Sequence, residues 1–385
     1  MSNSGKSTFV VALALLVGFS GVGLGAYSVF FQDPIAGPPG IDGTDGVDGV
    51  DGVDGTDGTD GTDGVNGTDG EDGAGAGEPV YYCSSEAEIN VALTAIGSGS
   101  GTITITQDIT LTASITINGN GGYIIQGVAP DITIDCNGDR SALRIEITQS
   151  CIIRDLTIDA RDITNSITNI IFVSDTLTHI ENVRIYGDSD YKGRGIYIDC
   201  ESVWVTNCYI SQVLYGIFGL DSVAHGLHVS DNSVLFCNDG IAGEGIYLGG
   251  DYSTCDNNYV WYCHIGIFAF GFQCAVSNNV LFGNLIRGIS VVTDYSTISG
   301  NSIRGYNALS SNNYYGIYIG SGSDYNVLSG NLIHSYFNGG TGTGYGISVI
   351  AASCDENTIV GNTVLNCDTA ISNSGTGTYM ADNNI

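Results

Sequence analysis

The stretch GISVVTDYSTISGNSI (Gly288–Ile303) contains the pattern that decides the fold, and GIYIDCESVWVTNCYI (Gly195–Ile210) is an earlier copy of it. Each stretch opens with a Gly-Ile pair and later carries an asparagine followed by a second apolar run. The Gly-Ile pairs begin at Gly195, Gly216, Gly245, Gly266, Gly288, Gly316 and Gly346. They mark successive starts of one repeated strand.

A second element of the repeat is an asparagine followed two residues later by Val or Ile. It recurs at Asn232, Asn258, Asn278, Asn301, Asn331 and Asn362, with spacings between 20 and 31 residues. A repeat of this length, made of strand and turn, predicts a solenoid of stacked coils about 4.8 Å apart. Asparagine suits a left-handed bend at a turn, and its side chain can bond to the coils above and below.

The repeated body extends upstream to about Val80. The stretch TITITQDITLTASITING (Thr102–Gly119) alternates β-branched and polar residues, as strands do. Before it, Ser85 and Glu88 have the spacing of a capping box, and the apolar residues Ile89, Ala92, Leu93 and Ile96 follow at helical spacing. We therefore expect one short helix over Ser85–Ile96.

The Gly-Ile and asparagine coils resemble those of the pectin-lyase-like superfamily of right-handed parallel β-helices, over most of residues 80–385. The resemblance implies an all-β solenoid whose short N-terminal helix caps the first coil. It implies little about activity, because the superfamily holds lyases, hydrolases, epimerases, tailspikes and adhesins.

Residues 1–32 form a first, apolar segment. No charged residue occurs between Phe9 and Phe31, which is long enough for one membrane-spanning helix, and Lys6 places the N-terminus on the cytoplasmic side. The alternative is a cleaved signal peptide with small residues around Gly23–Ala26. Either interpretation exports the rest of the chain, anchored to the cell membrane in the first case and secreted in the second.

Residues 33–79 form a collagen-like segment. From Gly37 to Gly73 every third residue is glycine, and the third position of most triplets is aspartate. This period predicts a triple-helical stalk and a homotrimer. An acidic disordered linker is the alternative, since no Lys or Arg pairs with the carboxylates. Asn66 begins an N-glycosylation sequon on this stretch.

The charge balance excludes some partners. Ten Lys and Arg against 41 Asp and Glu give a net charge of −31, which argues against nucleic acid and against bare polyanions. Only 13% of residues are charged, so the surface is built largely from Ser, Thr, Asn and Gly.

Eleven cysteines in an exported chain raise the question of disulfides. In the repeat, Cys237 and Cys263 should face each other in adjacent coils, and Cys255 and Cys274 occupy nearly equivalent points. A coil spacing of about 4.8 Å permits disulfides at both pairs. Buried free thiols are the alternative. Zinc is disfavoured because no CxxC motif occurs.

Acidic residues recur after the Gly-Ile strands, and three of them are followed by tyrosine. These Asp-Tyr pairs are Asp251 and Tyr252, Asp294 and Tyr295, and Asp324 and Tyr325. Stacked, they predict a carboxylate row beside an aromatic row that contacts a glycan, because tyrosine has a flat apolar face and a polar tip. Asp251, Asp294 and Asp324 are also candidate Ca²⁺ ligands. The alternative is that aspartate is simply a good turn residue.

Weak catalytic candidates are Asp199 and Asp221, which also follow Gly-Ile strands, and Arg194. The resemblance implies an essential Arg or Lys in polyuronate lyases, and Arg194 matches that requirement best. The hypothesis that we favour is a cell-surface structural or adhesive protein whose head binds glycan. A polysaccharide lyase or glycoside hydrolase, and a receptor-binding fibre, are the alternatives.

Overall fold

The computed structural model describes residues 78–385 except 147–149, 176, 222 and 306–311. All of these belong to one compact unit of the chain. The predicted membrane segment, the predicted stalk and Asn66 lie outside the described residues. Within the described part, no helix is long and apolar enough to cross a membrane.

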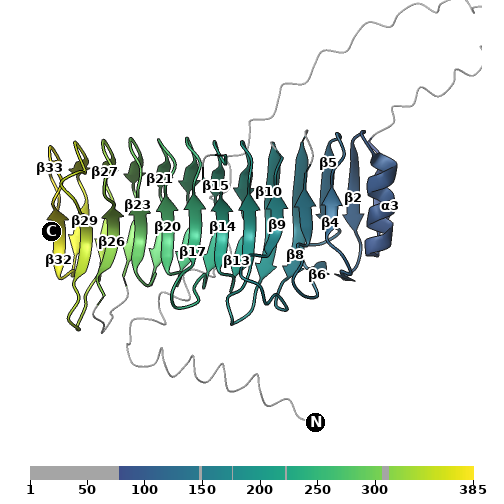
Figure 1. Cartoon of the computed structure of the whole chain (residues 1–385), viewed down its shortest axis with the longest axis horizontal. Helices are drawn as coiled ribbons and strands as arrows, with labels where there is room; N and C mark the ends of the chain where they lie inside the picture. Colours follow the sequence, from purple (N-terminus) through teal and green to yellow (C-terminus); the bar gives the residue numbers. More distant parts are fainter. Residues whose placement is uncertain (1–77, 147–149, 176, 222, 306–311) are drawn as a thin grey trace, which may run out of the picture. The chain divides into compact units, whose positions relative to one another are not determined.

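The described chain winds into a parallel β-helix of the right-handed type with about 12 turns (Figure 1). Every pairing between its strands is parallel, and each strand pairs with the equivalent strand of the next coil, as β14 and β17 do. Parallel strands joined by such crossovers are almost always right-handed, because the strand twist favours that hand. The predicted β-helix is therefore confirmed over the described residues.

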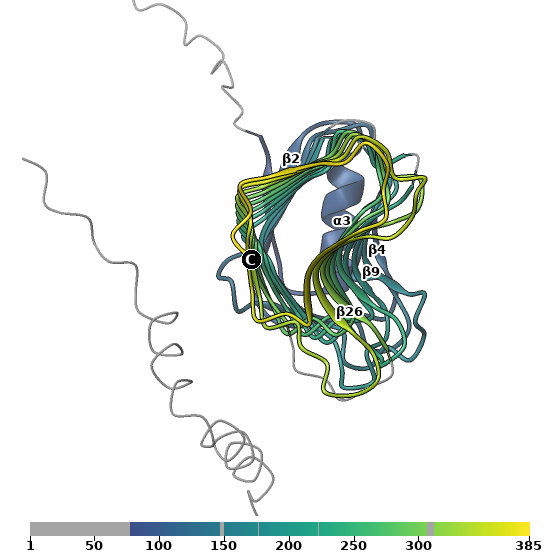
Figure 2. The ribbon, with the colours of Figure 1, turned by 90° about the vertical axis from the view of Figure 1, so that its left-hand side faces the viewer.

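One side of the solenoid is an 11-stranded sheet with one strand per coil. Its strands are β4 (Ile115–Ile117), β7 (Leu143–Ile145), β9 (Asn169–Val173), β11 (Arg194–Ile198), β14 (Tyr215–Gly219), β17 (Glu244–Leu248), β20 (Ile265–Ala269), β23 (Arg287–Val291), β26 (Tyr314–Ile319), β29 (Gly344–Val349) and β32 (Thr369–Asn373). Figure 2, which looks along the solenoid, shows this wall opposite the bent wall of the other sheet.

The remaining sides belong to a 22-stranded sheet, mostly with two short strands per coil. Its strands are β1 (Val80–Cys83), β2 (Gly101–Ile105), β3 (Ile109–Thr110), β5 (Tyr123–Gly127), β6 (Thr133–Asp135), β8 (Cys151–Asp159), β10 (Thr178–Tyr186), β12 (Trp204–Thr206), β13 (Tyr209–Ser211), β15 (His228–Ser230), β16 (Ser233–Leu235), β18 (Thr254–Asp256), β19 (Tyr259–Trp261), β21 (Ala275–Ser277), β22 (Val280–Phe282), β24 (Thr297–Ser299), β25 (Ser302–Arg304), β27 (Val327–Ser329), β28 (Leu332–His334), β30 (Thr358–Val360), β31 (Thr363–Leu365) and β33 (Tyr379–Ala381).

The isoleucine of each Gly-Ile pair points into the solenoid. These residues form a ladder from Ile196 through Ile217 and Ile246 to Ile347, and their exposed fractions are 0%. Burying each side chain contributes about 1.5–3 kcal/mol. The preceding glycine is required by space, since a Cβ on Gly216 would lie 2.4 Å from the carbonyl oxygen of Gly245 in the next coil.

The asparagine repeat forms a second buried ladder. The Oδ1 of Asn301 accepts from both the backbone N–H and the Nδ2 of Asn279, and Asn301 donates in the same way to Asn331. Its members are Asn232, Asn258, Asn279, Asn301, Asn331, Asn362 and Asn383.

One position of the predicted asparagine repeat was wrong. Asn278 is not in the ladder but precedes it, with a left-handed φ of 55°, and Asn279 takes the buried place. The repeated Asn-x-Val spacing misassigned this coil because two asparagines follow each other there. The left-handed residue at this turn is the one before the ladder, as Gly300 is before Asn301.

A helix lies at the N-terminal end of the solenoid. Helix α3 spans Glu86–Ile96, and the Ser85 hydroxyl accepts the Glu88 backbone N–H, as the predicted capping motif requires. The Glu88 carboxylate instead bonds to Ser84. The buried residues of α3 are Ile89, Ala92 and Ile96. Figure 2 shows α3 across the opening at this end.

The cysteines are free thiols, and ten of the eleven are buried. Cys237 and Cys263 follow the paired residues Leu235 and Trp261, so they occupy equivalent places in adjacent coils. Burial and the neighbouring Cys263 raise the pKa of the Cys237 thiol.

The expected equivalence of Cys255 and Cys274 was wrong. Cys255 pairs with Val276, so Cys274 is offset by two residues along the strand. That offset and the coil spacing together separate the Cα atoms by about 8 Å, outside the usual disulfide range.

Candidate functional site

The first candidate surface is the Asp–Tyr edge, the turns that follow the 11-stranded sheet. It comprises Asp251, Tyr252, Asp294, Tyr295, Asp324 and Tyr325. All three tyrosines have a left-handed φ of 57–58°, a conformation that L residues adopt at a cost. The row is not continuous, because Phe272 occupies the Asp position in the coil between Asp251 and Asp294.

The aspartates of this edge join one coil to the next. The Oδ1 of Asp251 accepts the backbone N–H of Phe272, at 2.8 Å. In the same way Asp294 accepts from Asp324, and Asp324 from Asp355. One oxygen of each carboxylate is thus committed to the turn, which is the structural role that aspartate commonly has there.

The tyrosine rings are exposed, but part of their faces is covered. The rings of Tyr295 and Tyr325 stack with centroids 4.7 Å apart and an angle of 11°, and Phe272 lies 5.2 Å from Tyr295. Stacked rings present edges and hydroxyls to solvent, so a sugar cannot lie on the shared faces. The Glu356 carboxylate in the next coil raises the pKa of Tyr325.

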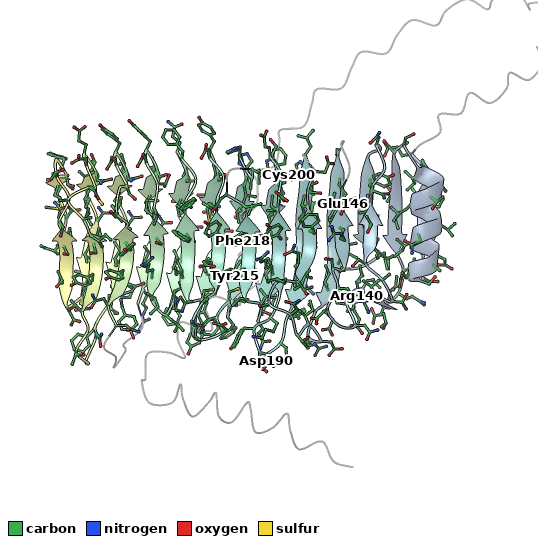
Figure 3. The ribbon with its side chains drawn as sticks, viewed as in Figure 1. Arg140, Glu146, Asp190, Cys200, Tyr215 and Phe218 are labelled. Carbon is green, nitrogen blue, oxygen red and sulfur yellow. The ribbon has the colours of Figure 1, made fainter. Side chains whose placement is uncertain are left out.

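The second candidate surface is the sheet face, the outer side of strands β9 to β29. This sheet faces the viewer in Figure 3, where Tyr215 and Phe218 project from β14. Side chains on this face come from the residue before each Gly-Ile pair and the residue after it. Although they point outward, several are buried: Tyr247 and Ile265 are 9% exposed and Ser290 is 0% exposed. Their neighbours on the same face therefore cover them, and this covered part of the sheet face is called the recess.

An aromatic row runs along the sheet face. Phe172, Tyr197, Phe218 and Tyr247 stack in successive coils at centroid distances of 5.9, 5.6 and 4.5 Å. Phe268 closes this stack edge-on at 5.1 Å. The stacking makes the row rigid along the solenoid axis.

Three arginines lie against aromatic rings on this side of the solenoid. Arg144, of the neighbouring strand β7, is 4.5 Å from the centroid of Phe172. The guanidinium of Arg194 is 4.9 Å from the centroid of Tyr197, and that of Arg287 is 3.7 Å from Tyr318, which lies outside the row. The Nε atoms of Arg194 and Arg287 are buried without a hydrogen-bond partner among the described residues. Arg287 lies inside the recess, where burial lowers the pKa of its guanidinium. Both Arg194 and Arg287 therefore have an Nε–H donor that no described residue uses.

Glu244 and His264 lie between Arg194 and Arg287. Burial raises the pKa of Glu244 to about 7, and its Oε2 has no hydrogen-bond partner in the described part of the chain. The Nδ1 of His264 is likewise without a partner there, and burial lowers its pKa. Buried polar atoms normally have partners, so Glu244 and His264 are candidates for contact with a ligand.

The three weak catalytic candidates lie together on this face. Arg194 belongs to β11, and Asp199 follows that strand directly. Asp221 accepts a hydrogen bond from the Tyr247 hydroxyl at 2.7 Å, and burial followed by this bond raises the pKa of Tyr247. Burial raises the pKa of the Tyr197 hydroxyl, and the carboxylates of Asp199 and Asp221 raise it further.

Sequence reasoning missed the rest of the sheet face. Glu244, His264, Arg287 and the aromatic row were not predicted as site residues. Strict alternation along a strand would place the residues before and after a Gly-Ile pair on opposite faces, because they are three positions apart. Only the folded chain shows them together, as in the contact of Arg194 with Tyr197 at 4.9 Å.

Calcium is not supported at the Asp–Tyr edge. Among the described residues, no group of three or more His, Cys, Asp or Glu side chains could hold a metal ion. At the edge itself, one oxygen of each carboxylate already accepts a backbone N–H.

The described residues thus form a right-handed parallel β-helix. A family model described as "Periplasmic copper-binding protein (NosD)" matches residues 178–384, which is more than half of the sequence. The chain belongs to this NosD family. No curated protein matches it at a significant level.

Solved structures resemble the fold at low identity. The Dettilon tailspike protein gp208 has a TM-score of 0.56 at 15% identity, over 77% of this chain and 62% of that one. A PL6 family polysaccharide lyase from Pseudopedobacter saltans has a TM-score of 0.52 at 13% identity, over 79% and 92%. A mutant of the periplasmic alginate epimerase AlgG has a TM-score of 0.50 at 12% identity, over 78% and 83%.

At these identities the likeness concerns the fold alone. The chain spans less than two thirds of the tailspike's length.

The residues do not fit the copper that the family description names. Copper is held by thiolates, thioethers or imidazoles brought together. No such group of His, Cys, Asp or Glu exists within the residues that the structure describes. Burial raises the pKa of Cys255 and Cys274, which opposes the thiolate form that a metal requires.

Proposed function

We propose that the β-helix is an exported polysaccharide-binding head that holds an extended glycan along the sheet face. The observation that carries this proposal is the recessed row of aromatic rings flanked by two arginines whose Nε atoms lack partners. The family description, which names periplasmic proteins, supports export. The membrane anchor and the trimeric stalk belong to the same proposal and rest on the sequence of residues 1–79.

The repeat of the face suits a polymer. Equivalent residues of adjacent coils lie about 4.8 Å apart, so a chain lying along the solenoid axis meets the same type of side chain at every coil. The Tyr197 hydroxyl can donate to a sugar hydroxyl, while aliphatic C–H groups of the sugar contact the ring edges of the row.

The arginines specify an acidic component in the glycan. Only ten Lys and Arg occur in the whole chain, and the net charge is −31, so two arginines in one recess stand out against the general repulsion of anions. A guanidinium binds a carboxylate or sulfate through parallel hydrogen bonds. Arg194 and Arg287 are four coils apart, about 19 Å, so we expect acidic groups at intervals along the polymer.

A glycan array probed with the full-length protein tests the proposal, followed by titration calorimetry on any binding oligosaccharide. Arg287→Met should weaken binding at least tenfold, because the variant keeps the side-chain length but loses the charge and donors. Arg304→Met is the matched control, since Arg304 lies 5.1 Å from the Phe282 ring on the other sheet. Equal affinities in both variants, or no binding to any acidic glycan, would contradict the proposal.

A second candidate site for the same function is the Asp–Tyr edge. Tyr252, Tyr295 and Tyr325 are 60%, 48% and 42% exposed, which is unusual for large rings. A receptor-binding fibre could use either the Asp–Tyr edge or the sheet face to contact its receptor.

A second candidate function is a polysaccharide lyase or hydrolase, and Glu244 favours it. A carboxyl with a pKa near 7 can take up and release a proton at neutral pH, as a general acid or base must. Shortened or unsaturated products from a bound glycan, lost in Glu244→Gln, would establish this activity. Intact glycan after prolonged incubation with saturating protein would exclude it.

A further inference from the structure

We infer that β1 and α3 form an interface between copies of this chain, in which Tyr82 of one copy packs into a hollow beside α3 of the next. The neck patch is the name used here for Val80, Tyr82 and Val91 together with that hollow. This surface is separate from the glycan-binding face, and the choice of a second copy as its partner rests on the trimeric stalk of the proposed function.

The neck patch is apolar and open. The exposed fractions of Tyr82, Val91 and Val80 are 71%, 69% and 51%. Beside them lies a hollow of about 320 Å³, lined by Tyr81, Tyr82, Cys83, Ala87, Glu88, Val91 and Ala92. Scattered apolar residues on a surface are ordinary, but a projecting ring next to an apolar hollow has the form of an interface.

The backbone at this place is also unprotected. Within the described part of the chain, strand β1 pairs with β2 alone, so the other edge of Val80–Cys83 has free N–H and C=O groups. The strand sequence VYYC carries no charge or proline, the usual means of blocking edge pairing. Two independent features, an open edge and an apolar patch, therefore occur together.

The position in the chain identifies the partner. The collagen-like period ends at Gly73, and β1 begins at Val80, seven residues later. A triple helix over Gly37–Gly73 would hold the β1 strands of three copies within about 25 Å of its end. Tethering of this kind raises the effective concentration to the millimolar range, so even a weak contact forms.

The geometry of the patch fits a closed ring of three. Tyr82 lines one wall of the hollow and is 71% exposed, so in a head-to-tail contact its ring can enter the same hollow on the next copy. Such contacts close into a ring when the rotation matches the symmetry, here the threefold of the stalk. Glu88 lies at the rim of the hollow, and its carboxylate accepts hydrogen bonds from the backbone N–H and the hydroxyl of Ser84. These hydrogen bonds lower the pKa of Glu88.

Cysteine cross-linking in the full-length chain tests the contact. Tyr82→Cys should give a disulfide-linked dimer on mild oxidation, because Tyr82 of one copy enters a hollow that Tyr82 of the next copy lines. Ile241→Cys is the control, since Ile241 is 83% exposed far along the solenoid. Equal cross-linking in the two variants, or a monomeric mass by light scattering, would overturn the inference.

A second variant separates assembly from folding. Tyr82→Ser combined with Val91→Ser should raise the concentration at which the oligomer dissociates at least tenfold in sedimentation velocity. The unfolding temperature of the head should stay the same, because both side chains are exposed. Unchanged dissociation would show that another part of the chain covers the patch, and the inference would be wrong.

Discussion

The Asp–Tyr edge and the sheet face both repeat along the solenoid, but they use their polar groups in opposite ways. At the edge, the Asp324 carboxylate accepts a backbone N–H from the next coil. On the sheet face, Glu244 and Arg287 retain buried polar atoms with no partner among the described residues. The repeated carboxylates of the edge therefore have a structural role, whereas the unpaired groups of the sheet face are the ones that can bind a ligand under the proposed function.

The aromatic residues differ between the two surfaces as well. Tyr295 and Tyr325 are held at a left-handed turn and project into solvent. On the sheet face, Phe218 and Tyr247 extend from a flat strand and are held between neighbours at 5.6 and 4.5 Å. A rigid row loses less conformational entropy on binding than exposed rings do.

Paired variants test most directly which of the two surfaces binds the glycan. Replacing Arg194 and Arg287 together by Met should weaken binding of an acidic glycan about 100-fold, or about 2.7 kcal/mol. Replacing Tyr295 and Tyr325 together by Ala should change it less than threefold. The measurement is calorimetric affinity for one oligosaccharide, and the reverse order of effects would assign the ligand to the edge.

Glu244 gives the next largest effect, on stability. Its pKa is raised from the ordinary value of 4.5 to about 7, so the folded state binds the proton more tightly than the unfolded state does. The stability that this proton contributes is complete below pH 4.5 and is lost as the pH rises to about 7. The loss should be about 2–3 kcal/mol at most, given the shift. Denaturation curves should show it in the wild type and not in Glu244→Gln.

The edge makes a smaller contribution to stability. Asp324→Ala removes the acceptor of the Asp355 N–H and should cost about 1 kcal/mol, because that N–H can turn to water. Asp355→Ala is the matched control, since no hydrogen bond to its carboxylate occurs in the described part of the chain. Equal midpoints of urea unfolding in the two variants would remove the structural role assigned to the Asp324 carboxylate.

The smallest effect concerns binding at different pH values. Ionisation of Glu244 places a negative charge between Arg194 and Arg287, so affinity for an acidic glycan should fall about threefold between pH 6 and pH 8. Glu244→Gln should abolish this dependence. A dependence that persists in the variant would point to His264 as its source.

Much of the fold was predictable because the repeat is a local property. Each Gly-Ile pair and each asparagine turn is readable in one coil, and stacking converts it into a ladder, as Ile217 and Ile246 show. The register failed only where the local signal was ambiguous, at Asn278 and at Cys274. There a shift of one or two residues leaves the composition of the coil unchanged.

The candidate site was predictable only in part. The sequence indicated Arg194, Asp199 and Asp221 through a resemblance and through their places after strands, and the structure brings them to one face. It did not distinguish Glu244 from an ordinary surface carboxylate, because burial is a property of the recess and not of the residue. The stacking that covers the tyrosine faces of the edge was likewise invisible in the sequence.

The sequence by itself determined the solenoid, its coil length and the short helix at its beginning, since periodicity and capping are encoded residue by residue. Only the tertiary structure decided which polar groups are hydrogen-bonded within the described part of the protein and which are available to a ligand. That distinction depends on residues of adjacent coils, which are far away in the sequence. The Asp355 backbone N–H, 31 residues away, donates to the Asp324 carboxylate. Glu244, in contrast, keeps a buried Oε2 with no partner among the described residues. The role of a carboxylate depends on its burial and on the hydrogen-bond donors around it, and both come from the adjacent coils.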